Sequence, residues 1–96
     1  MDLHHSTARR FQAAPDVVIE RMGDTMLAVH LGSDKIIELN ETAAHLVDLL
    51  LGGSTDREAA AAMAETYDVP YDVLWENIES TLATLVSESV LAELKR

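Results

Sequence analysis

The side chains able to do acid–base or metal chemistry are few, and their spacing forms no recognisable constellation. His4 and His5 are adjacent near the N-terminus, but no further ligand lies near them, so we expect no metal site. His45 lies between apolar neighbours, which is typical of a surface or hydrogen-bonded histidine. Glu76 and Glu79 share one face of a predicted helix, and a solvated acidic face explains them.

Motifs of known catalytic chemistry are also missing from the sequence. There is no cysteine, which excludes disulfides, thiolate zinc sites and cysteine nucleophiles. There is no glycine-rich phosphate loop, HExxH motif or nucleophile elbow. Ser33-Asp34 has the residue types of a carrier-protein attachment site, but the order is reversed and the pair lies in a predicted turn. We therefore expect a protein that is not an enzyme and holds no cofactor.

The distribution of charge argues against nucleic acid as a partner. The chain has 96 residues and a formal net charge of −10. Between residues 16 and 94, three basic residues oppose sixteen acidic ones, a net charge of −13. A domain with this net negative charge repels the phosphate backbone of a nucleic acid. No apolar run approaches the roughly 18 residues of a membrane span, and the N-terminus lacks a signal-peptide core, so we expect a cytoplasmic protein without a membrane partner.

The first half of the chain is predicted to form three short strands. Residues 17–22, 26–31 and 35–39 are β-branched or alternating, and the turn signals Gly23-Asp24 and Gly32-Ser33-Asp34 separate them. Consecutive strands joined by tight turns make an antiparallel meander, whose first and third strands have an open edge. On the third strand, period-2 alternation puts Ile37 and Leu39 on the core face, with Ile36 and Glu38 on the other.

At Asn40 the hydrophobic period changes from about two to about 3.6, so a strand passes into a helix. Asn40 is the predicted N-cap of a helix over residues 41–51, which ends at two glycines. Thr55 and Glu58 form a capping box for a second helix over residues 56–67. A third helix runs from residue 71 or 72 to 87, and Val90-Leu91 after it can return to the core. The expected buried stripes are Ala43, Leu46, Val47, Leu50 and Leu51 in the first helix, and Leu74, Ile78, Leu82 and Leu85 in the third.

These elements predict an α+β, winged-helix-like domain over residues 16–94, preceded by a flexible tail over residues 1–15. Within this tail, Phe11 is expected to pack onto the domain. Winged-helix domains commonly place one helix in the DNA major groove. The third predicted helix would be that helix, but it carries Asp72, Glu76 and Glu79 and no lysine or arginine. A DNA-binding regulator is therefore the weaker alternative.

A run of features between residues 36 and 69 occurs in a fixed order. It begins with residues 36–44 (IIELNETAA) and continues with a leucine-rich helix that ends at two glycines. Residues 55–58 (TDRE) follow, and then an alanine-rich helix that ends in residues 67–69 (YDV). This pattern resembles the PqqD family of recognition elements for ribosomally synthesised and post-translationally modified peptides. The likeness covers about residues 17–94. It departs at the C-terminal end, where the family often has a glycine before a closing Leu-Leu or Leu-Val and this chain has residues 87–91 (SESVL).

The resemblance implies a non-catalytic binder of the leader region of a precursor peptide, which it presents to a maturation enzyme such as a radical SAM enzyme, a leader protease or a cyclase. The leader would add as an antiparallel strand beside the third strand, in a groove next to the third helix; an open strand edge suits such addition. Another possibility is a structural or regulatory subunit that binds a different protein through the same edge. The peptide-binding residues implied by position are Lys35, Ile36, Ile37, Glu38 and Leu39 on the strand, and Leu74, Asn77, Ile78, Thr81 and Leu85 on the helix.

Overall fold

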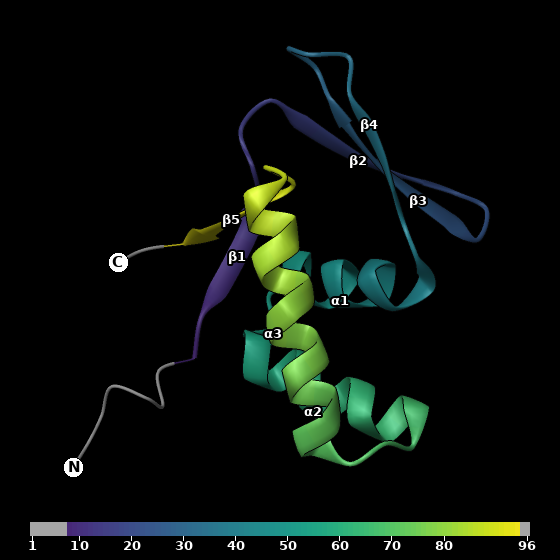
Figure 1. The fold of residues 1–96 in the computed structure, drawn as a ribbon, viewed down its shortest axis with the longest axis vertical. Helices are drawn as coiled ribbons and strands as arrows, with labels where there is room; N and C mark the ends of the chain where they lie inside the picture. Colours follow the sequence, from purple (N-terminus) through teal and green to yellow (C-terminus); the bar gives the residue numbers. More distant parts are fainter. Residues whose placement is uncertain (1–7, 95–96) are drawn as a thin grey trace.

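The central sheet has the predicted meander. The computed structural model describes residues 8–94, so His4 and His5 lie outside the described residues. Strands β2 (Val17–Met22), β3 (Thr25–His30) and β4 (Ile36–Leu39) pair antiparallel in the order β2-β3-β4 (Figure 1). Gly23 turns the chain between β2 and β3 with a φ of 66°, a conformation that glycine adopts without strain. The meander predicted from alternation is therefore confirmed.

A second, two-stranded antiparallel ribbon joins the two ends of the described chain. Strand β1 (Arg10–Ala13) pairs with β5 (Leu91–Leu94), and Phe11 lies opposite Glu93. Phe11 is only 4 % exposed, and Val90 just before β5 is fully buried. This ribbon corrects the expectation of a flexible tail over residues 10–13, because here the chain is a paired strand.

The start of β1 is also anchored by a buried carboxylate. Asp56, which is 1 % exposed, accepts hydrogen bonds from the backbone N–H of Arg9 and from its Nε, both at 2.9 Å. The Nη2 group of Arg9 reaches Glu79 at 3.0 Å. Because a buried carboxylate is stable only when it is paired and hydrogen-bonded, these contacts fix the N-terminal strand against the helices.

The three helices begin and end where their caps predict. In α1 (Glu41–Leu51), the side chain of Asn40 accepts from the N–H of Ala43 at 2.8 Å. The capping box of Thr55 and Glu58 opens α2 (Asp56–Tyr67), and Pro70 precedes α3 (Tyr71–Ser87). Leu51 was expected in the buried stripe but is 42 % exposed, because it is the last residue of α1, where the chain turns away; Ala44 is buried in addition to the expected residues.

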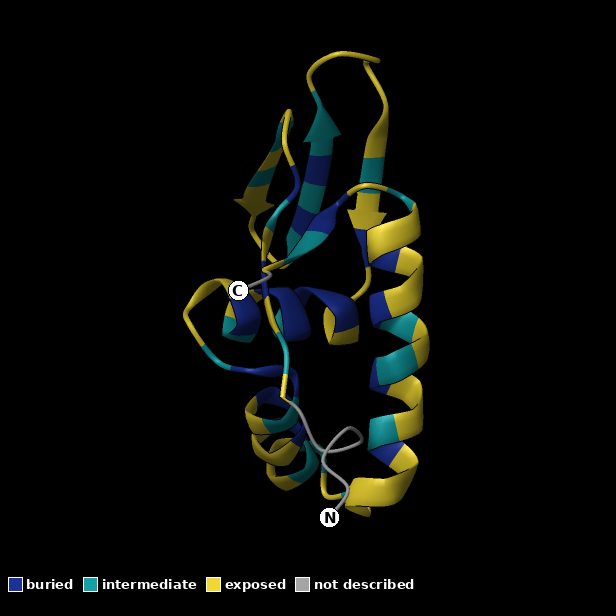
Figure 2. Cartoon of the chain, turned by 90° about the vertical axis from the view of Figure 1, so that its left-hand side faces the viewer, coloured by how far each residue is buried: buried dark blue, intermediate teal, exposed yellow. Residues whose placement is uncertain are grey.

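The core lies where the helices meet one another and the inner face of the sheet (Figure 2). All four residues of the predicted α3 stripe are buried: Leu74, Ile78, Leu82 and Leu85. The sheet contributes Met26, Ala28 and Leu39, and β5 contributes Leu91. Among the described residues, no helix has the length and apolar character needed to cross a membrane.

Candidate functional site

Strand β4 has an open edge, because it pairs with β3 on one side and with no other strand among the described residues. The N–H of His30 donates to the carbonyl of Lys35 at 2.8 Å, one step beyond the paired residues Val29 and Ile36. In an antiparallel ladder, hydrogen-bonded pairs alternate with non-hydrogen-bonded pairs. The backbone groups of Ile37 therefore point toward β3, whereas those of Ile36 and Glu38 point outward.

The side chains of β4 divide between the two faces of the sheet as predicted. Leu39 is 5 % exposed and Ile37 is half-buried, so both face the helices. Ile36 is 61 % exposed and Glu38 is exposed on the outer face. Lys35 has the same parity as Ile37 and points to the helix side, where it meets α3.

The side of α3 next to β4 is identified by one ion pair. The Nζ of Lys35 donates to the Oε1 of Glu88, just after α3, at 2.8 Å. Residues spaced three or four apart share one side of a helix, so the line through Glu88 contains Thr84, Thr81 and Asn77. Glu79, which contacts Arg9, lies on the opposite side. We call the following set the β4–α3 surface: Lys35, Ile36, Ile37, Glu38, Asn77, Thr81, Thr84 and Glu88.

The structure separates the ten site residues predicted from sequence into two groups. Leu39, Leu74, Ile78 and Leu85 are between 1 % and 5 % exposed and belong to the core. The other six are exposed or half-buried: Lys35, Ile36, Ile37, Glu38, Asn77 and Thr81. Helix periodicity puts Asn77 and Thr81 on the same side of α3 as Glu88. Sequence reasoning missed two residues of the β4–α3 surface, Thr84 and Glu88, which the spacing of seven and eleven residues after Asn77 would have identified.

The Lys35–Glu88 pair also affects the pKa of Glu88. The hydrogen bond from Lys35 lowers the pKa of Glu88 below its ordinary value of 4.5, and the charges of Lys35 and His30 act in the same direction. The imidazole Nε2 of His30 lies 3.1 Å from the carbonyl of Ser89, so this nitrogen carries the proton that is donated.

Lowering the pH is expected to break this ion pair. A carboxylate whose pKa is lower in the folded protein contributes stability above its ordinary pKa, and that contribution is lost as pH falls through the lowered value. The pair should therefore be intact at and above the ordinary pKa of 4.5 and be lost only as the pH falls through the lowered pKa of Glu88. Carbon-detected NMR titration of the Glu88 carboxyl measures this, and Lys35→Met should raise its midpoint. An unchanged midpoint in Lys35→Met would contradict the assigned cause.

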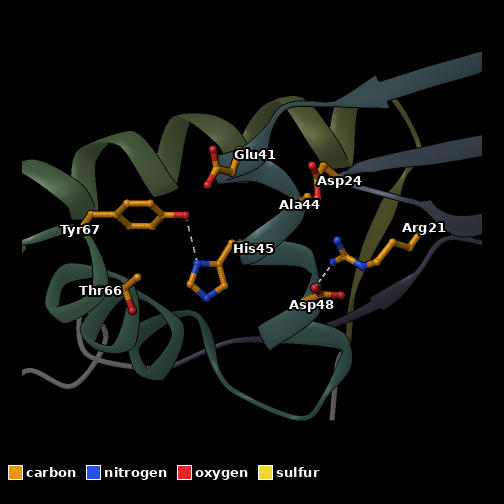
Figure 3. A pocket seen from close by; sticks show the side chains of 8 residues that line it. All are labelled: Arg21, Asp24, Glu41, Ala44, His45, Asp48, Thr66 and Tyr67. Carbon is orange, nitrogen blue, oxygen red and sulfur yellow. Dashed lines mark hydrogen bonds and ion pairs between the residues drawn. The ribbon is translucent and has the colours of Figure 1, made fainter.

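Two pockets lie away from β4. The first, of about 320 Å³, is an open pocket lined by the β2–β3 hairpin, α1 and the end of α2 (Figure 3). In it, the Nδ1 of His45 lies 3.1 Å from the hydroxyl of Tyr67, and Arg21 pairs with Asp48. His45 is thus hydrogen-bonded, as its sequence context predicted. The second pocket, of about 300 Å³, lies between β1, β5 and the far side of α3, beside Phe11.

The sequence of the chain matches a known protein family over most of its length. The family model described as coenzyme PQQ synthesis protein D (PqqD) matches residues 25–91, which include β4 and α3. The protein therefore belongs to the PqqD family.

Two solved structures share its fold. One is a lasso peptide synthetase B1 complexed with the leader peptide: it is 22 % identical with a TM-score of 0.81, and the match covers 86 % of this chain and 98 % of that one. The other is TbiB1 in complex with the TbiA(beta) leader peptide, at 19 % identity and a TM-score of 0.80, covering 88 % and 99 %. A search of curated proteins gave no significant match.

Proposed function

We propose that this protein binds the leader region of a ribosomally synthesised precursor peptide and presents it to a separate maturation enzyme, without catalysing a reaction itself. The leader adds as an antiparallel strand to the outer edge of β4 and lies against the α3 side of the β4–α3 surface. The maturation enzyme is of a class that acts on such precursors, for example a radical SAM enzyme, a leader protease or a cyclase.

The observation that carries this proposal is the outward direction of the backbone groups of Ile36 and Glu38. Each offers one N–H donor and one carbonyl acceptor on an edge that no other strand of residues 8–94 covers, which is what a peptide strand requires. The family membership and the two neighbours solved with leader peptides support the same function. The acidic α3, which has no lysine or arginine, does not favour DNA binding.

A cysteine cross-linking scan tests the direction and register of the added strand. The chain has no cysteine of its own, so single cysteines at Ile36, Ile37 and Glu38 are unique. The probe is a peptide selected on the purified protein from a phage-displayed random library and synthesised with a cysteine at each position in turn. Disulfides form only where Cβ atoms approach within about 3.5–4.5 Å, so each protein cysteine should select one peptide position.

The expected result is a peak at one peptide position for Ile37→Cys. That peak should move one residue toward the peptide C-terminus for Ile36→Cys and one residue toward its N-terminus for Glu38→Cys, because antiparallel partners run in opposite directions. Shifts in the reverse sense would show a parallel strand. Cross-linking without any preferred position would overturn strand addition at β4. A cysteine at the exposed Glu20 on β2 is the matched control, and it should select no position.

A further inference from the structure

The C-terminal end of α3 concentrates negative charge. The C-terminus of a helix carries the negative end of its dipole, where a cation is stabilising and an anion is not. The last turn of α3 contains no basic residue, and its C-cap is itself acidic, Glu88. The surrounding body, with a net charge of −13 over residues 16–94, adds to this field. This end of α3 therefore favours a cationic partner.

Lys35 supplies that cation from outside the helix. Its Nζ lies 2.8 Å from the Oε1 of Glu88, and the side chains of the two residues are 55 % and 42 % exposed. An exposed lysine on a flexible stem is held weakly, so another cation can replace it at small cost.

The geometry of strand addition brings a peptide side chain to the same place. The carbonyl of Lys35 points toward His30, whose N–H it accepts, so on its outer side Lys35 faces a peptide residue at a non-hydrogen-bonded position. Side chains at such a position lie close together and on the same face of the sheet. That peptide residue, two positions after the one opposite Ile37, therefore lies on the helix side of β4, beside Lys35 and Glu88.

We propose that Glu88 and the C-terminal end of α3 form a cation-selecting subsite for the bound peptide. In the free protein Lys35 occupies this subsite; in the complex a lysine or arginine of the peptide, two residues after the residue opposite Ile37, replaces it. The inference rests on the proposed function and adds to it the chemical class of one leader residue. Lys35 and Glu88 together are then specificity determinants.

The test compares two peptides that differ at this one position. The probe is the phage-selected peptide whose register the cysteine scan defines, made with lysine or with methionine there, and affinity is measured by fluorescence anisotropy. The parent protein should bind the lysine peptide about two- to fivefold tighter than the methionine peptide, the range of an exposed ion pair. Glu88→Gln should abolish this ratio by lowering the affinity for the lysine peptide.

Two further variants separate a local subsite from general charge attraction. Lys35→Met removes the competing cation and should increase the preference for the lysine peptide. Glu76→Gln makes the same change of charge on an exposed position of α3 away from β4, and it should leave the ratio as in the parent. If the parent binds both peptides equally, or if Glu76→Gln lowers the ratio as much as Glu88→Gln does, the subsite is wrong. In either case tight binding of the methionine peptide would leave the proposed function standing, whereas failure of both peptides to bind would overturn both.

Discussion

The Glu38→Pro variant is expected to fold like the parent and to bind the peptide probe at least about tenfold more weakly. Proline removes the backbone N–H and is tolerated on an edge strand where that donor faces outward, as it does at Glu38. The peptide then loses one main-chain hydrogen bond and keeps an unsatisfied carbonyl, which costs about 1–3 kcal/mol. Circular dichroism reports the fold, and fluorescence anisotropy with the labelled peptide reports the affinity.

The matched Ile37→Pro variant should show the opposite behaviour. Ile37 lies opposite Ala28, which is fully buried, and its N–H points into the sheet. Proline there breaks the ladder between β3 and β4 and should lower the free energy of unfolding by at least about 2 kcal/mol. Glu38→Ala retains the N–H and is the control for loss of the side chain. If folded Glu38→Pro bound the peptide as well as Glu38→Ala does, the leader would not pair with this edge.

The choice between these two prolines depends on information that the sequence lacks. Alternation along residues 35–39 predicted which side chains face the core, because burial imposes the same period on the sequence. It did not predict which backbone groups point outward, since that depends on the register against β3. One hydrogen bond, from His30 to Lys35, resolves the question.

The elements predicted best are those with local signals. Asn40, Thr55 and the paired glycines mark helix boundaries through contacts within one turn, so all three helices were predicted closely. Strand β1 has no such signal. Its four residues are ordered by β5 at the far end of the described chain and by the carboxylate of Asp56, and neither partner is visible from the local sequence around Phe11.

The predicted site was limited by a similar ambiguity. A hydrophobic stripe identifies the buried side of a helix, but it does not show which flank meets the neighbouring strand. The predicted site therefore includes Leu74, Ile78 and Leu85, which the structure buries in the core, and their contact with the peptide stays a prediction. The flank is determined by the contact between Lys35 and Glu88, two residues from distant segments whose charges alone predict no pairing.

Ile78→Ala tests this division between core and peptide-binding surface. Ile78 is 1 % exposed, so truncation removes buried methyl groups and leaves a cavity, and the free energy of unfolding should fall by about 2–5 kcal/mol. Peptide affinity, measured at a temperature where the variant remains folded, should stay within about twofold of the parent, because a buried side chain does not contact the peptide.

Thr81→Ala, one turn further along α3 on the flank beside β4, should behave in the reverse way. Thr81 is half-buried and belongs to the β4–α3 surface. The free energy of unfolding of the Thr81→Ala variant should therefore change by less than about 1 kcal/mol, while its affinity for the peptide falls about threefold. Urea unfolding measures the free energy of unfolding of each variant, and an unchanged m-value shows that only stability differs. Ile78→Val, with an expected loss of about 0.5–1.5 kcal/mol, keeps the comparison possible if Ile78→Ala does not fold. A loss of peptide affinity in folded Ile78→Val larger than that in Thr81→Ala would place Ile78 in the binding site, and the leader would then reach deeper between β4 and α3 than strand pairing at the edge requires.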